Sequence, residues 1–328
     1  MRPFEYASPK TKDQVPALLG AHWGETEVLA GGTDLLSLMK DEVTAPSRLV
    51  NIKGIQDLHG VSNSPTGLRI GALMTLAELG ANVEVKRQYP DLALAAGDAA
   101  SPQIRNLATL GGNLCQRPRC WYFRTGHGLL AKDKDGKSLV LAGDNRYHAI
   151  LGNQGPAYFV SPSTIAPVLI AYQAKVRLLG PQGARELSLE KFFVVPGNEN
   201  EREHDLRSNE IVTEVVIPNA GSVKAAHYEI RQKEAFDWPL AVAAVGLKMN
   251  GSTVQSARVI LGSVAPTPWR SPEGEQALSG KTISEAVAKS AADAALQNAK
   301  PLSHNAYKVQ LARVALRRAI LKAAGGAA

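Results

Sequence analysis

The chain has 328 residues, of which 45% are hydrophobic and 20% are charged. That composition is typical of a globular protein and excludes a mainly disordered one, and at roughly 150 residues per domain the length predicts about two domains. No apolar run reaches the ~18 residues that a membrane-spanning helix needs. The best candidates, 164–172 and 239–247, are too short or interrupted, so no membrane span is predicted.

The charge and the cysteine content exclude two further classes of protein, nucleic-acid binders and disulfide-rich domains. Lys and Arg number 37 against 30 Asp and Glu, a net charge of +7, yet the basic residues occur singly or in small groups. Aromatic residues make up only 5%, too few for a base-stacking surface, so no nucleic-acid partner is expected. Two cysteines cannot form a disulfide framework.

The N-terminus lacks the apolar stretch of roughly 7–15 residues that marks a secretory signal. We therefore expect a cytoplasmic protein, or a periplasmic one if an exported partner subunit carries it.

The first half of the chain predicts mixed α and β structure with short elements. Thr75 is a good N-cap for a helix that continues through Leu79, and an Ala-rich helical stretch at 91–108 is broken at Ser101 and Pro102. The other expected elements are strands at 4–6, 27–30, 48–52 and 68–72, a helix at 11–23 and a helical turn at 35–40. Residues 115–156 form a polar stretch with weak periodicity, which we interpret as an insertion.

The second half predicts the end of one domain and the start of another. A helix is expected at 163–171, strands at 174–179, 184–187 and 211–217, and a charged boundary-like loop at 198–209. Beyond residue 220, strands at 223–231, 240–249 and 253–261 precede helices at about 283–300 and 304–323. This order predicts an α+β fold, with a first domain at 1–220 and a smaller domain at 221–328 in which helices cover one face of a three-stranded antiparallel sheet.

The first functional signal is a glycine pair that follows a strand, in Ala30, Gly31, Gly32, Thr33 and Asp34. Glycine permits a positive φ and lets backbone N–H groups approach an anion, and the helical turn after the pair adds further unpaired N–H groups. When this segment is taken alone, an ordinary tight turn is the favoured interpretation. A helix terminus contributes only ~0.3–1 kcal/mol to anion binding at exposed sites, so one such loop cannot hold a large cofactor.

A second segment has the same ingredients: Thr109, Leu110, Gly111, Gly112 and Asn113. Two such loops together predict a dinucleotide in a cleft between two small subdomains. The sequence lacks the G-x-G-x-x-G fingerprint of the Rossmann fold and the Gly-Lys-Ser/Thr ending of a P-loop. Neither of these two known phosphate-binding motifs is therefore predicted.

The two longer motifs that contain these pairs, 29–35 and 101–113, resemble the FAD-binding medium subunit of the molybdenum hydroxylases, the xanthine dehydrogenase and aldehyde oxidoreductase family. The similarity extends over nearly the whole chain. Segments 115–124 and 231–239 are similar to the bacterial periplasmic-type aldehyde oxidoreductase branch.

The resemblance implies a two-subdomain FAD-binding fold of the vanillyl-alcohol-oxidase type, followed by a C-terminal α+β domain. It also implies an assembly with a molybdopterin-binding large subunit and a two-iron ferredoxin-like small subunit. Substrate would be oxidised at molybdenum in another chain, and electrons would pass through iron–sulfur centres to the FAD bound here and then to an external acceptor. A flavin-free scaffold that keeps the fold only to join its partners is the alternative.

The resemblance also implies the cofactor-binding residues, and no acid–base catalyst is among them. The positions that match are Leu29, Ala30, Gly31, Gly32, Thr33 and Asp34 around the pyrophosphate, Ala108, Thr109, Gly112 and Asn113 on the phosphate and flavin side, and Ile104 near the isoalloxazine. Thr164 stands where the family usually has an acidic residue, and Glu229 stands where the family often has a lysine. Either change would alter flavin binding or the flavin's potential.

Cys115 and Cys120 lie in a segment that carries four cysteines in the similar branch, where they ligate a four-iron cluster. Because four thiolates are the usual requirement, we expect no such cluster and no metal ligand in this chain. His127 or Asp133 as replacement ligands, and a disulfide between the two cysteines, are the alternatives. A disulfide needs Cα atoms within roughly 4.4–6.8 Å, and a reducing cytosol opposes it.

Overall fold

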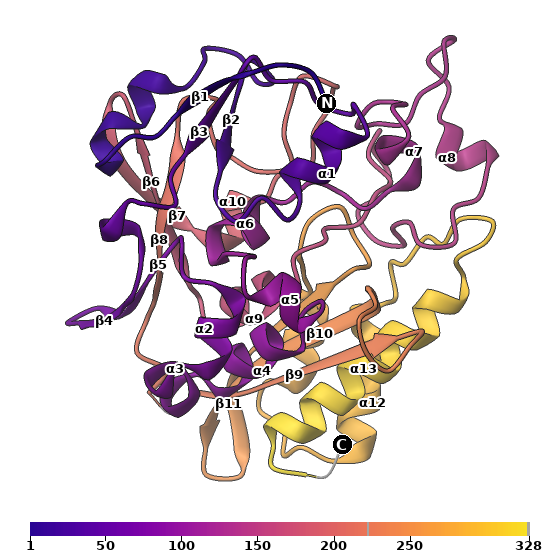
Figure 1. Cartoon of the computed structure of the whole chain (residues 1–328). Helices are drawn as coiled ribbons and strands as arrows, with labels where there is room; N and C mark the ends of the chain where they lie inside the picture. The colour runs from indigo at the N-terminus through magenta and orange to yellow at the C-terminus, as the bar shows by residue number, and fades with distance from the viewer. Residues whose placement is uncertain (222, 327–328) are drawn as a thin grey trace.

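The computed structural model describes residues 1–221 and 223–326 (Figure 1). Three sheets organise the chain. The first is parallel, in the order β1-β3-β2, and the other two are antiparallel, in the orders β4-β5-β8-β6-β7 and β12-β11-β10-β9. The strands are β1 (Glu5–Ala7), β2 (Thr26–Leu29), β3 (Arg48–Asn51), β4 (Val61–Ser64), β5 (Gly67–Gly71), β6 (Lys175–Gly180), β7 (Gly183–Ser188), β8 (Ile211–Ile217), β9 (Val223–Arg231), β10 (Pro239–Asn250), β11 (Thr253–Gly262) and β12 (Trp269–Arg270).

Short helices connect the first two sheets, and longer ones follow the third. The α-helices are α1 (Leu35–Lys40), α2 (Leu76–Ala81), α3 (Val83–Gln88), α4 (Pro90–Asp98), α5 (Pro102–Arg105), α6 (Leu110–Cys115), α7 (Trp121–Arg124), α8 (Leu139–Ala142), α9 (Ala166–Ala171), α10 (Leu189–Phe192), α11 (Pro272–Leu278), α12 (Glu285–Ala295) and α13 (Tyr307–Ala323). Three 3-10 turns are η1 (Lys12–Gln14), η2 (Pro16–Leu18) and η3 (Gln56–Leu58). No helix in the described ranges is long and apolar enough to cross a bilayer.

The N-cap prediction at Thr75 is confirmed. Its hydroxyl accepts a hydrogen bond from the N–H of Glu78 at 3.1 Å, and the Glu78 carboxylate accepts one from the N–H of Thr75 at 2.8 Å, which is a complete capping box. Ser101 caps α5 in a similar way, since its Oγ accepts from the N–H of Ile104. The predicted break at Ser101 and Pro102 is therefore the start of a new helix.

The helix predicted at 11–23 is wrong. The chain forms only η1 and η2 there, because Pro16 has no N–H to continue a helix from the first turn. The helix predicted at 163–171 begins only at Ala166, as α9, with Pro167 in its first turn.

The C-terminal sheet has four strands, so the prediction of three is wrong. After β11 the chain turns back, and the two residues of β12 pair with it, Ile260 with Arg270 and Leu261 with Trp269. A two-residue strand is too short to show any alternation in the sequence.

Both faces of this sheet are covered, although the sequence predicted one. Ala244 and Ile260 join the core of the first domain near α9, and Ala243, Val245 and Leu261 pack in a second core with α12 and α13. Burial on both faces explains why β10 is apolar almost throughout, a pattern usual for a doubly covered strand.

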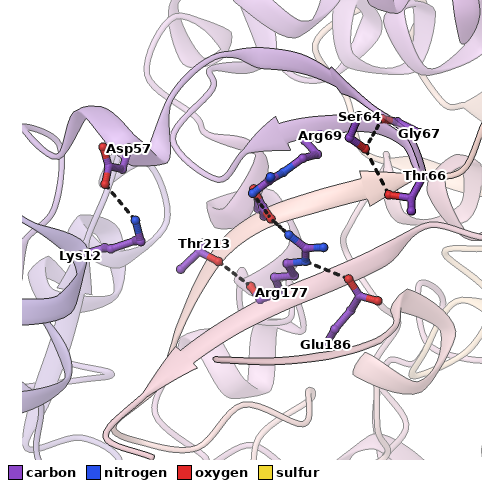
Figure 2. Close-up of polar contacts among 10 residues, drawn as sticks. Lys12, Asp57, Ser64, Thr66, Gly67, Arg69, Arg177, Glu186 and Thr213 are labelled. Carbon is purple, nitrogen blue, oxygen red and sulfur yellow. Dashed lines mark hydrogen bonds and ion pairs between the residues drawn. The ribbon is translucent and has the colours of Figure 1, made fainter. Parts of the chain in front are cut away.

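A ladder of alternating charges crosses the second sheet (Figure 2). Glu214 on β8 pairs with Arg69 on β5 at 2.7 Å and with Arg177 on β6 at 2.6 Å, and Arg177 also pairs with Glu186 on β7 at 2.8 Å. Cross-strand pairs of opposite charge stabilise a sheet and its register. This face of the sheet is thus polar, while its other face carries the core.

The segment 115–156 is a packed part of the fold, not a polar loop. It contains α7 and α8, and Phe123 and Leu130 form a small core with Leu38 of α1. Ile150 enters the core of the C-terminal sheet. The segment therefore bridges the two halves of the chain (Figure 1, upper right).

Candidate cofactor-binding site

A cavity of about 1270 Å³ opens between the first sheet, the second sheet, the segment 115–156 and the connection between β9 and β10. Small-ligand pockets typically measure roughly 300–1,000 Å³, so this one has room for a dinucleotide. The lining includes every sequence-predicted site residue except Leu29: Ala30, Gly31, Gly32, Thr33, Asp34, Ile104, Ala108, Thr109, Gly112, Asn113 and Thr164. Leu29 is buried with Leu49 and Met39 in a separate small core.

The first glycine pair forms an anion site of backbone amides. The chain leaves β2, turns at Gly32 with φ of 72°, and enters α1 at Leu35. The N–H groups of residues 31 to 35 donate to no group within 1–221 or 223–326. Five consecutive unpaired amides beside a cavity are the backbone arrangement that binds phosphate groups.

The second glycine pair differs from the prediction, because it lies in the first turn of α6 and its amides are already paired. The N–H of Gly112 donates to the Thr109 hydroxyl at 3.1 Å, and that of Gly111 donates to the carbonyl of Ala72 at 2.8 Å. A Cβ on Gly111 would lie 3.1 Å from the Cβ of Ala72. Glycine is therefore needed for close packing here, and the free amides come from the first pair.

Three side chains that line the cavity keep a buried polar atom without a partner among the described residues. They are Oγ1 of Thr164, Nε of Arg119 and Nδ1 of His204. Buried polar atoms in proteins are nearly always hydrogen-bonded, so unpaired ones on residues that line a cavity fit a ligand rich in acceptors and donors. The residues present thus fit a flavin dinucleotide.

The Asp34 carboxylate faces the segment 115–156. It accepts hydrogen bonds from the N–H of Arg117 at 2.8 Å and from the Arg124 guanidinium at 2.8 Å, and Arg119 lies 3.1 Å away. Two guanidinium groups offset a charge that would otherwise repel a phosphate. Asp34 therefore contributes its amide to the site, while its side chain holds the neighbouring segment.

One end of the cavity is walled by residues that the sequence did not single out. Arg202 lies over the ring of Trp23, 4.6 Å from its centroid, and pairs with Glu27 at 2.9 Å. Burial raises the pKa of Glu27 to about 7. His204 stacks on Phe192, and burial lowers the pKa of its imidazole to about 4, so the ring is neutral at pH 7.

These residues were missed because 198–209, which supplies Arg202 and His204, has the composition of a solvated boundary loop. In the structure it forms a wall of the cavity. Trp23, a tryptophan close to a predicted strand, was the feature of the sequence that could have indicated this wall.

The other end of the cavity is open to solvent. Ile104, Phe236 and Trp238 line it and remain 40%, 68% and 43% exposed. The Arg119 guanidinium lies over the Trp238 ring at 4.5 Å and so joins the segment 115–156 to the β9–β10 connection.

The two cysteines face different surroundings. Both are free thiols, so the disulfide alternative is wrong. Cys115 packs against the core of the first domain and burial raises its pKa to about 12, whereas Sγ of Cys120 lies 3.2 Å from Nε2 of His148. Asp133 caps a turn through the amides of residues 135 and 137. The described residues contain no group of three or more His, Cys, Asp or Glu side chains placed to hold a metal.

Comparison with known proteins decides the family. Residues 2–220 match the family described as the FAD binding domain in molybdopterin dehydrogenase. The chain belongs to the FAD-binding subunits of the molybdenum hydroxylase family. Residues 226–323 match the CO dehydrogenase flavoprotein C-terminal domain. The resemblance drawn from the sequence is confirmed, and FAD is the cofactor that this family binds.

Two relatives illustrate the similarity. This molybdenum hydroxylase flavoprotein is 32% identical over 326 residues to the aldehyde oxidoreductase FAD-binding subunit PaoB of Escherichia coli K12, covering 98% of this chain and 99% of the relative. It is 30% identical to the carbon monoxide dehydrogenase medium chain of Hydrogenophaga pseudoflava, covering 97% and 96%. A solved structure of carbon monoxide dehydrogenase from that organism superposes with a TM-score of 0.77 at 29% identity, over 99% of this chain and 98% of the other.

Proposed function

We propose that this flavoprotein carries FAD as the electron-transfer subunit of a molybdenum-dependent aldehyde or aromatic-heterocycle oxidoreductase. It takes electrons from iron–sulfur centres in a partner subunit and passes them to an external acceptor. The observation that carries the proposal is the run of five unpaired amides at 31–35, which opens on a dinucleotide-sized cavity. Full-length similarity to an aldehyde oxidoreductase subunit supports the aldehyde class.

Different residues around the cavity are proposed to bind different parts of the cofactor. The amides of 31–35 would bind the diphosphate, the Thr164 hydroxyl would hydrogen-bond the ligand, and Ile104 and Trp238 would lie against the ring. When bound, the flavin supplies the electron-accepting and electron-donating chemistry. The chain itself orients the cofactor and sets its electrostatic surroundings.

The proposed assembly contains a molybdopterin-binding large subunit and a two-iron ferredoxin-like small subunit. The relatives include medium chains of carbon monoxide dehydrogenases, which are parts of larger complexes. In this arrangement the large subunit selects the substrate.

The first test is the flavin content of the purified full chain. We expect a yellow protein that releases FAD on denaturation, or that takes up FAD after reconstitution. A folded protein that stays colourless after incubation with FAD would instead support the flavin-free scaffold.

Metal and flavin analysis of the complex co-purified from its host tests the partners at the same time. We expect FAD, molybdenum and iron together, with the iron recovered in a different chain from the flavin. Iron that follows this chain through subunit separation would contradict the proposal.

A further inference from the structure

We propose that Arg119, carried by the segment 115–156, binds the phosphate groups of the cofactor and supplies positive charge to them. The inference rests on the proposed function, because it concerns the same cavity. It adds a cofactor contact from outside both glycine motifs.

Arg119 contacts the side chain of one of the residues whose amides are free. Its guanidinium is 3.1 Å from Oδ1 of Asp34, and the N–H of Asp34 is one of the five unpaired amides. Arg119 also lines the cavity. Phosphate groups held by those amides would therefore lie within reach of its side chain.

The Arg119 side chain is fixed on two sides and still has a donor to spare. One terminal nitrogen donates to Oε1 of Gln116 at 3.0 Å, and the guanidinium lies over the Trp238 ring. Its Nε is buried and has no partner among the described residues. Leaving a charged donor buried and unpaired is costly, and a phosphate bound beside this guanidinium would supply an acceptor.

The charges around Arg119 also favour phosphate binding. Burial lowers the pKa of Arg119 to about 10, so the guanidinium remains charged at neutral pH. The free amides offer only partial charges, and Asp34 pairs with both Arg124 and Arg119, so these three side chains together carry a net positive charge. A guanidinium facing the cavity is the fixed positive charge that a diphosphate needs, and Arg forms strong charge-assisted hydrogen bonds to phosphate.

Arg124 provides a matched contrast. It also binds Oδ1 of Asp34, at 2.8 Å, but its Nε donates to the carbonyl of Pro118 and its terminal nitrogen to that of Arg117. Its Nε and one terminal nitrogen are therefore occupied by Asp34 and by carbonyls of the segment, and it is not among the residues that line the cavity. Arg124 and Arg119 share the same carboxylate, yet only Arg119 is placed to reach a ligand.

The test is a titration of the full-length apoprotein with three ligands that differ in phosphate content: riboflavin, FMN and FAD. We compare the unchanged chain with Arg119→Gln and Arg124→Gln, and follow flavin fluorescence. Arg119→Gln should raise the Kd for FAD roughly 10- to 100-fold, as expected for the loss of a hydrogen bond to a charged group, and leave that for riboflavin unchanged. Arg124→Gln removes one of the two charges that offset Asp34 but no cavity-lining contact, so it should raise the Kd for FAD by a smaller factor than Arg119→Gln.

Three results would overturn the inference: an unchanged Kd for FAD in Arg119→Gln, an equal loss for riboflavin and FAD in that variant, or a loss of FAD affinity in Arg124→Gln as large as that in Arg119→Gln. If Arg119→Gln does not fold, Arg119→Lys replaces it. The loss of FAD affinity should then be smaller, and this loss should disappear as the salt concentration rises. An unchanged chain that binds none of the three flavins would refute the proposed function itself. Retained FAD binding without an effect at Arg119 refutes only this inference.

Discussion

Gly31 lies against the carbonyl oxygen of Leu107 so closely that a Cβ at position 31 would be 1.8 Å from that oxygen. This contact joins the two motifs that carry the glycine pairs, which are far apart in the sequence. The free amides on one motif and the side chains on the other consequently face the same cavity.

Gly31→Ala should therefore separate the two motifs. Because backbone and not a flexible side chain occupies the space, we expect a loss of roughly 1–3 kcal/mol of stability and a strong loss of FAD binding. Thermal unfolding and flavin content measure both effects. Gly54→Ala is the control, since nothing lies within 4 Å of its added Cβ. Equal flavin content in Gly31→Ala and the unchanged chain would refute the role of this contact.

Thr164→Val separates cofactor binding from stability. The buried hydroxyl has no partner among the described residues, so its removal should leave the stability of the apoprotein unchanged or higher. The Kd for FAD should rise roughly 2- to 10-fold, as expected for one neutral hydrogen bond. A destabilised apoprotein with unaltered FAD affinity would mean that the hydroxyl serves the fold.

Ser163→Ala is the neighbouring comparison for that variant. Its Oγ donates to Oδ1 of Asn113 at 2.7 Å and accepts from the N–H of Ala166, so this change should lower stability in the apoprotein.

The glycine pairs could be recognised in the sequence because a turn with positive φ and a helix start depend on adjacent residues. The cavity-lining positions of Trp23, Arg202 and Arg119 could not, because these residues come from three distant segments and line the same cavity only in the folded chain. A lone arginine in a polar stretch is usually solvated, and neither Arg119 nor Arg202 has a local pattern that marks it as a cavity residue.

The same distinction explains the errors in the fold. The strands of the third sheet were found from their apolar pattern, but β12 is two residues long and pairs only through the return of the chain. The second glycine pair looked like the first, yet the packing of Gly111 against Ala72 turns it into a helix start whose amides are paired. Tertiary contacts decided both cases.

The buried imidazole of His204 should make stability fall at acidic pH. Burial lowers its pKa from 6.5 to about 4, so between these values the unfolded chain gains a proton that the folded chain does not. The contribution is complete above pH 6.5 and disappears as the pH falls to about 4, and it amounts to roughly 3 kcal/mol.

Urea unfolding of the apoprotein at several pH values tests this dependence. His204→Gln should flatten the decline between pH 6.5 and 4, whereas His127→Gln, which changes an exposed ring, should leave the profile as it is. Identical slopes for His204→Gln and the unchanged chain would show that another group governs the acid transition.

Lys308 on α13 joins the segment 115–156 to the end of β11. Its ammonium is buried and donates to the carbonyl oxygens of Tyr147 at 3.1 Å, His148 at 3.1 Å and Ser263 at 2.7 Å. Lys308→Met keeps most of the side-chain volume but leaves three carbonyls without this donor, so we expect a loss of roughly 3 kcal/mol of unfolding free energy. Lys289→Met, at an exposed position on α12, should change little.

Limited proteolysis shows whether the lost stability is local. The segment 115–156 is hydrogen-bonded at one end to Asp34 and at the other to Lys308. Lys308→Met removes the second of these contacts and should therefore expose the segment to cleavage before the rest of the chain unfolds. Because Arg119 lies in that segment, early cleavage should also be accompanied by weaker FAD binding. Global unfolding with no early cut would mean that the segment and the two cores unfold as one cooperative unit.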